Sequence, residues 1–169
     1  MSFDELAAAR RTHKAFGAEP VDRETLIELF ELARLAPNHH LTQPWRFRVL
    51  GPTSLTRLKD AGGPSEALKL DRAPTLVVAS ARLSGELLQD EEDVCATAAA
   101  ITLVLLGATE RGLASYWRTP GVLRTARGRE AAGVPEGERV LGLIHLGPVE
   151  REPAPRERGP VDEYVSFLP

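Results

Sequence analysis

Cysteine is almost missing from this chain of 169 residues, where Cys95 is the only one. A single cysteine cannot form an intrachain disulfide, so the chain is not a secreted scaffold held by disulfide bridges. It also excludes a CxxC redox motif and a cysteine-rich zinc site. We expect Cys95 to be a buried structural thiol, because it lies in a strongly apolar segment with no neighbouring cation that would activate it.

Long apolar runs and a large charge excess are also lacking. We find no run long enough to span a bilayer, and the start MSFDELAAARR has no signal-peptide core. We therefore expect a cytoplasmic protein without a membrane partner. The net charge of -3 does not favour nucleic acid as a partner. A basic nucleic-acid module built on Arg10, Arg11, Lys14, Arg156 and Arg158 stays an alternative, which predicts salt-dependent binding.

Familiar catalytic patterns do not occur either. The chain has no Ser-His-Asp set, no glycine-rich phosphate loop and no dinucleotide fingerprint. His39, His40 and Cys95 fit no standard metal-ligand spacing, so we expect no metal site. His145 lies inside an apolar strand-like run and is expected to be a packed core histidine.

What the chain does have is an alternation of helical and strand-like segments. We expect one α/β (α+β) domain over residues 1–169, with a central mixed sheet flanked by helices. The predicted strands are 45–50, 75–81, 114–118 and 140–146, and the main predicted helices are 22–35, 53–60, 93–111 and 122–132, the last with a break at Gly128. The run 75–81 (TLVVASA) predicts a strand that is buried on both faces.

The predicted helix 93–111 is apolar on nearly every side and rich in alanine. Such a helix must be buried, with close packing against another helix. A chain of this size has few ways to cover every face, so an oligomer interface is a natural destination for one of them.

The segment APNHHLTQPWRF, from Ala36 to Phe47, is the most informative loop. Pro37 ends the preceding helix, and Pro44 fixes the backbone before the strand. Between them stand five polar residues in six positions, Asn38, His39, His40, Thr42 and Gln43. A rigid polar loop predicts a binding site, although a plain surface loop with a buried tryptophan anchor fits equally well.

Basic residues gather near both ends. Arg10, Arg11, Thr12 and Lys14 suit a phosphate, because guanidinium groups and a hydroxyl can grip its oxygens. A basic helix end that complements the dipole is the plainer alternative. The charged, proline-rich tail from Glu150 ends in the apolar residues Val161, Tyr164, Val165, Phe167 and Leu168. We expect 150–169 to be an arm, either wrapped around a partner subunit or folded back on its own.

Taken together, four segments resemble the FMN-dependent nitroreductase family in its short bacterial form. They are ARRTHKAF, APNHHLTQPWRF, GLASYWRTPG, and LGLIHLGPV followed by PRERGPVDEYV. The match runs essentially end to end and keeps the family's order. The chain departs from the family at Leu41, at Thr97 to Thr102, and in a lid-like insertion that is largely missing.

The resemblance implies a homodimer with FMN at its interface. It assigns phosphate contacts to Arg10, Arg11, Thr12, Arg156 and Arg158, and a place beside the flavin ring to Lys14. It puts Trp117, Arg118 and Thr119 at a strand end along the flavin, and Leu35 and His39 on the other subunit. Lys14 and Arg118 would give electrostatic support, since no side chain is implied to act as a catalytic acid or base.

The function implied is a ping-pong oxidoreductase. It would take a hydride from NADH or NADPH and reduce a small-molecule acceptor, such as a nitroaromatic or a quinone. Flavin would supply the redox chemistry, which suits a chain without acid-base machinery. The alternative on the same fold is an FMN-binding protein, a reservoir or sensor without useful turnover.

Overall fold

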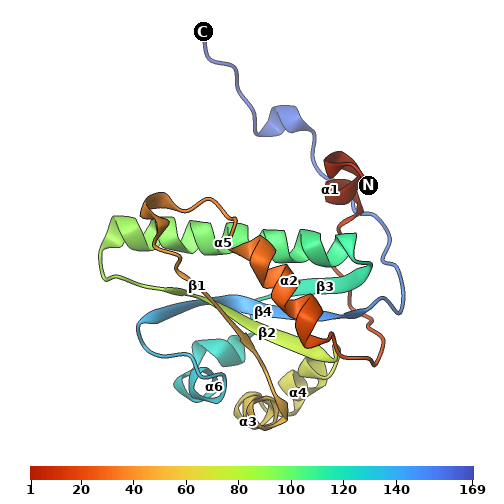
Figure 1. Cartoon of the computed structure of the whole chain (residues 1–169), viewed down its shortest axis with the longest axis vertical. Coiled ribbons are helices and arrows are strands. Elements are labelled where there is room, and N and C mark those ends of the chain that lie inside the picture. Colours follow the sequence, from red (N-terminus) through yellow and green to blue (C-terminus); the bar gives the residue numbers. More distant parts are fainter.

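A four-stranded sheet forms the middle layer of the molecule, and helices cover both of its faces (Figure 1). The computed structural model describes the whole chain, residues 1–169. Its strands, in the spatial order β1-β2-β4-β3, are β1 (Trp45–Val49), β2 (Thr75–Arg82), β3 (Leu113–Arg118) and β4 (Glu138–Pro148). All four strands expected from the sequence are confirmed, and β4 continues through Gly147 and Pro148.

Every neighbouring pair of strands runs antiparallel, which corrects the mixed sheet expected from the sequence. The connection between β1 and β2 returns the chain to the end of the sheet where β1 stops, so no parallel crossover forms. Within β2, Leu76 and Val78 join the core on one face, whereas Val77 and Ala79 join the core on the other. This double burial confirms the prediction for the apolar run 75–81.

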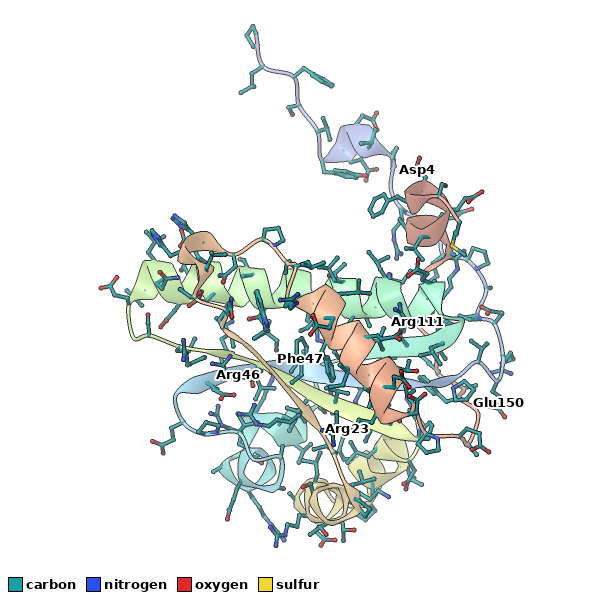
Figure 2. All side chains as sticks on the ribbon, viewed as in Figure 1. Asp4, Arg23, Arg46, Phe47, Arg111 and Glu150 are labelled. Carbon is teal, nitrogen blue, oxygen red and sulfur yellow. The ribbon has the colours of Figure 1, made fainter.

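Two helical layers complete the fold. On one face lie α2 (Arg23–Ala33) and α5 (Leu87–Glu110), and on the other α3 (Pro52–Gly62), α4 (Pro64–Leu70), the 3₁₀ turn η2 (Gly121–Arg124) and α6 (Ala126–Ala131). Side chains fill the space between the layers (Figure 2), where Phe30 of α2 stacks on Phe47 of β1 with ring centroids 5.0 Å apart. The break expected at Gly128 falls at Thr125 instead, because the Thr125 hydroxyl accepts from the Gly128 amide and caps α6.

The helix α5 begins earlier than predicted, at Leu87. In its first turn, the Asp90 carboxylate accepts from the backbone amide and the hydroxyl of Ser84, at 2.6 and 2.9 Å, which fixes the segment that leads into the helix. The expected close packing against another helix is confirmed at Gly107, where a Cβ would collide with Leu32 of α2. Arg111 also donates to Glu28 of α2 at 3.0 Å.

Two predictions about helix α5 are wrong. One concerns its length and apolar composition, and the other the exposure of Cys95. By length and composition α5 could cross a membrane, contrary to expectation, although 50% of its apolar window is buried inside the domain. We interpret it as a core helix, since it packs on both α2 and the sheet. Cys95 is exposed rather than buried, because it lies on the side of α5 that faces away from the core.

Helix α1 (Phe3–Ala9) and the first part of the C-terminal arm lie beside each other at one side of the molecule (Figure 1). Helix α1 starts with a capping box, in which Ser2 and Glu5 exchange hydrogen bonds of 2.7 and 3.2 Å. The arm 150–169 passes α1 and extends away from the sheet, with only a short 3₁₀ turn, η3 (Val161–Glu163). Its apolar tip is open to solvent, with Tyr164 72% and Phe167 96% exposed.

Candidate functional site

Residues from the two ends of the chain line one pocket of about 760 Å³. We call it the arginine pocket. One wall is the segment after α1 and the other is the base of the C-terminal arm. The lining residues are Arg10, Arg11, Thr12, Lys14, Ala15, Arg151, Pro153, Ala154, Pro155, Arg156 and Arg158.

The N-terminal wall is built by an extended segment that pairs first with the edge strand β3 and then with the end of β4. The His13 amide donates to Ser115 O at 3.0 Å, and the Gly17 amide donates to Pro148 O at 2.9 Å. Side chains of an extended segment alternate in direction. His13 is therefore buried, while Thr12 and Lys14 on either side of it are exposed at the pocket.

Arg11 combines the two roles that the sequence left open. Its guanidinium donates to Ala8 O, and to Arg10 O at 3.1 Å, where α1 has unpaired carbonyls at its end. The same residue lines the arginine pocket. The basic cluster thus caps a helix and contributes positive charge to a cavity at the same time.

Prolines shape the opposite wall. Pro153 and Pro155 restrict both their own backbone and that of the residue before each, which keeps this part of the arm extended. Arg156 and Arg158 then reach the same cavity as Arg10. Arg151 lines it too, and it was not among the phosphate contacts predicted from the sequence. Its place in the same basic, proline-rich run was the signal that could have found it.

The charge of the pocket decides what it can hold. Six fixed cations line it, namely Arg10, Arg11, Lys14, Arg151, Arg156 and Arg158, together with the Thr12 hydroxyl and no carboxylate. Guanidinium groups bind phosphate oxygens bidentately. A bound phosphate dianion would also relieve the mutual repulsion of the six cations. The residues present therefore fit a phosphate group.

The strand end at Trp117 to Thr119 does not line the arginine pocket. Trp117 packs in the core below α5 and donates its indole N–H to Leu141 O at 3.1 Å. Arg118 turns to the other face of the sheet and pairs with Glu66 of α4, where burial lowers the pKa of its guanidinium. Thr119 lines a separate small cavity beside Pro120 and Leu141.

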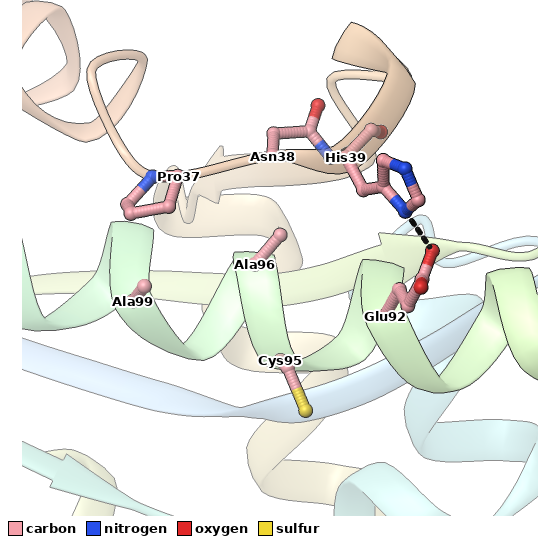
Figure 3. A pocket seen from close by; sticks show the side chains of 7 residues that line it. All are labelled: Pro37, Asn38, His39, Glu92, Cys95, Ala96 and Ala99. Carbon is pink, nitrogen blue, oxygen red and sulfur yellow. Dashed lines mark hydrogen bonds and ion pairs between the residues drawn. The ribbon is translucent and has the colours of Figure 1, made fainter.

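Leu35 and His39 lie on a different part of the surface, next to α5. Leu35 is exposed, and His39 Nδ1 lies 2.9 Å from Glu92 Oε2 of α5 (Figure 3). His39 and Glu92 border an open hollow of about 310 Å³, which also includes Cys95 but not Leu35. Figure 3 shows the Cys95 side chain directed away from His39, so the two do not form a common metal site.

The loop that carries His39 is held by hydrogen bonds in addition to its prolines. The Thr42 hydroxyl donates to the buried Asp93 carboxylate at 2.5 Å, and Asn38 Oδ1 accepts from the Gln43 amide at 2.6 Å. His40, Leu41 and Gln43 all have positive φ angles, at 54°, 49° and 46°. Such backbone angles persist only where surrounding contacts hold them, which is a feature typical of binding loops.

Sequence comparisons show which known proteins the chain resembles. A sequence profile of the nitroreductase family matches residues 7–62 and 59–148. YfhC of Bacillus subtilis, named as a candidate NAD(P)H nitroreductase, is 24% identical over 97% of this chain and 93% of its own length. Nitroreductase NfnB of Mycolicibacterium smegmatis is 38% identical over 58 residues, 34% of this chain and 25% of its own length.

Solved structures share the fold over the whole chain. The nitroreductase-like family protein from Bacillus cereus superposes with a TM-score of 0.90 and 25% identity, over 99% of this chain and 96% of its own. The FMN- and NADPH-dependent nitroreductase NfnB from Sphigopyxis sp. strain HMH gives a TM-score of 0.84 at 19% identity over 100% of both chains. Since the profile covers most of the sequence and the architecture agrees, the chain belongs to the nitroreductase family, a family of oxidoreductases.

Proposed function

We propose that this chain binds FMN and works as an NAD(P)H-dependent oxidoreductase that reduces a nitroaromatic, a quinone or a similar acceptor. The arginine pocket is the observation that carries the proposal. Its cations come from opposite ends of the sequence, which meet where Phe16 pairs with Val149 in an antiparallel bridge. In a member of the nitroreductase family, a cavity built for a phosphate is best explained by a flavin nucleotide.

The protein's own residues would bind and orient the cofactor. When bound, FMN supplies the hydride chemistry between NAD(P)H and the acceptor. Arg10, Thr12, Arg156 and Arg158 would hold its phosphate, and Arg11 would add charge from the end of α1. Lys14, an exposed cation at the pocket, would favour negative charge on the nearby edge of the flavin ring.

We also propose that two copies of the chain form the active unit. The arm ends in exposed apolar side chains, among them Tyr164, Phe167 and Leu168. Exposed residues also follow one stripe of α5, at Leu88, Cys95 and Thr102. Apolar surface of this kind needs a partner. In such a dimer the loop with Leu35 and His39 would reach the other copy's cofactor, which suits its rigidity and its distance from the arginine pocket.

The visible spectrum of the purified protein tests the function directly. We expect flavin absorption bands after purification or after mixing with FMN, bleaching when NADH or NADPH is added, and recovery when a nitroaromatic or quinone is supplied. Bands without bleaching would instead support the reservoir or sensor on the same fold. A colourless protein that does not take up FMN would contradict the proposal.

A pair of matched variants tests the pocket. Replacing Arg158 with glutamine should weaken FMN binding about tenfold or more, because a charge-assisted contact to phosphate is lost. Arg57→Gln on α3 removes an exposed arginine that does not line the pocket, and should leave FMN binding unchanged. Equal losses in both variants would show that overall charge, rather than this pocket, controls binding.

We propose a cytoplasmic location as well. The exposed free thiol at Cys95 suits a reducing compartment, which is also where NAD(P)H is available. Fractionation of the source cells should recover the protein with cytoplasmic markers. Recovery with periplasmic or membrane fractions would contradict this.

A further inference from the structure

We propose that His13 is a positioning residue, which attaches the C-terminal arm to the N-terminal segment so that both sets of cations face one phosphate. The inference rests on the proposed function, because it concerns how the arginine pocket is assembled. It assigns a role to a residue that lies between Thr12 and Lys14 but does not itself line the pocket.

The edge strand β3 fixes one side of the histidine ring. His13 is only 5% exposed. Its amide donates to Ser115 O at 3.0 Å, and its Nδ1 accepts from the Ser115 amide at 3.3 Å. Since Nδ1 is the acceptor, the hydrogen of the neutral ring is on Nε2.

The other side of the ring faces the arm. His13 Nε2 is buried and has no hydrogen-bond partner, but Glu152 Oε2 lies 3.6 Å from it. The Glu152 side chain is 73% exposed, so it can turn to accept from the ring N–H. Both neighbours of Glu152 in sequence, Arg151 and Pro153, line the arginine pocket.

This contact matters because the arm has little else to hold it. Residues 151–159 make no hydrogen bond to the rest of the domain, and the approach of Glu152 to His13 at 3.6 Å is the one contact of a charged arm residue with a polar ring or ion of the domain. An unattached arm would lose conformational freedom when its arginines close on a phosphate, and this loss would weaken binding. His13 holds the base of the arm beside Thr12 and Lys14 before the phosphate arrives.

Two substitutions by neutral residues distinguish the contact of His13 with Ser115 from its contact with Glu152, and neither removes a residue of the arginine pocket. The side-chain oxygen of His13→Asn can accept from Ser115, as Nδ1 does, but it cannot reach the arm. The amide nitrogen of His13→Gln can extend toward Glu152 as Nε2 does. We expect His13→Asn to raise the dissociation constant for FMN about threefold, in line with an exposed polar contact, and His13→Gln to recover part of that loss.

Riboflavin is the control ligand, because it carries the same ring system without the phosphate. Its dissociation constant, measured like that of FMN by quenching of flavin fluorescence, should be the same in wild type and both variants. A general loss of structure at His13 would instead weaken both ligands together, and would overturn the positioning role.

Glu152→Ala gives a second test at an exposed residue that should not affect folding. Removing a negative charge near a basic pocket would by itself tighten FMN binding. If Glu152 holds the arm, Glu152→Ala weakens FMN binding instead, and adding His13→Asn has no further effect. Tighter FMN binding in Glu152→Ala, or full additivity of the two changes, would overturn the inference. Failure of the wild-type protein to bind either flavin would instead contradict the proposed function.

Discussion

At the scale of single residues, His145 shows how the core sets the charge of a side chain. It lies on β4 between Phe16 and Tyr116, with ring centroids 6.2 and 5.6 Å away, and neither of its nitrogens has a hydrogen-bond partner. Burial, and then the positive charges of Arg118 and Arg72, lower its pKa to about 3. The packed core histidine expected from the sequence is confirmed, and it is neutral at physiological pH.

This histidine should make folding stability fall in mild acid. Between its ordinary pKa of 6.5 and the folded value of about 3, the unfolded chain binds a proton that the folded chain does not. Stability from this residue is therefore complete above pH 6.5 and declines as the pH falls, by at most about 1.4 kcal/mol per pH unit. Urea denaturation at pH 7 and pH 5 should show a smaller decline for His145→Leu than for wild type. Equal declines would contradict a neutral buried His145.

Lys14 offers a second test at this scale. If it supports negative charge on the flavin ring, Lys14→Met should slow bleaching by NADH about tenfold or more while FMN is still retained, because oriented charges act on charge that develops during the reaction. Lys14→Arg keeps the charge and should keep most of the rate. Parallel losses of FMN binding and bleaching rate in Lys14→Met would reduce Lys14 to a phosphate contact.

At the scale of elements, a buried ionic network joins three strands. Arg48 of β1 donates to both carboxylate oxygens of Glu138 at the start of β4, at 2.8 Å each, and to Ser80 of β2 at 2.9 Å. Burial acts to raise the pKa of Glu138, but hydrogen bonds from Arg48 and Ser80 outweigh it and lower the pKa. Stability from this carboxylate is present above its usual pKa and is lost as the pH falls through the lowered value.

Breaking this network from one side should be costly. Arg48→Met leaves Glu138 buried without its cation, and we expect it to lower the free energy of unfolding by about 2–4 kcal/mol. The double variant Arg48→Met, Glu138→Leu should recover most of that loss, because no unpaired charge remains. Thermal or urea denaturation at pH 7 measures both. A double variant less stable than Arg48→Met would show that the network itself, rather than the avoidance of an unpaired charge, stabilises the sheet.

The elements were largely predictable because their signals are local. Helix α2 begins where Asp22 caps it, with Asp22 Oδ1 accepting from the Thr25 amide at 2.9 Å. Strand directions were not predictable in this way, because they depend on where a connection returns the chain. The exposed side of α5 was not predictable either, because a helix that is apolar all round does not indicate which of its sides is exposed to solvent. That is why Cys95 was wrongly expected to be buried.

At the scale of the whole molecule, the sequence pointed to the arginine pocket only through its resemblance to a family. Residues 10 and 158 are too far apart for spacing alone to bring them together, yet both line the cavity. The direction of the Arg118 side chain was not predictable from the sequence. Alternation along β3 puts neighbouring side chains on opposite faces of the sheet, but it does not say which residue points to which face. The ion pair with Glu66 places it away from the pocket.

The exposed apolar tip of the arm is a second feature of the whole molecule. The tip of the arm projects from the molecule (Figure 1), and its Phe167 and Leu168 side chains are 96% and 87% exposed. A second copy of the chain is the partner we propose, since the arm could pack on it while its arginines stay at the pocket. The tip and the arginines are separate in sequence, so they can be varied independently.

Replacing both tip residues, Phe167→Ser with Leu168→Ser, should therefore weaken a dimer without removing any residue of the arginine pocket. Sedimentation of the wild type should give twice the 18.4 kDa mass of one chain, and the double variant should dissociate at concentrations where the wild type does not. Leu68→Ser removes another exposed leucine, from α4, and should leave the mass unchanged. If the wild type sediments as a single chain, the tip must have another function, and a site shared between two copies would be ruled out.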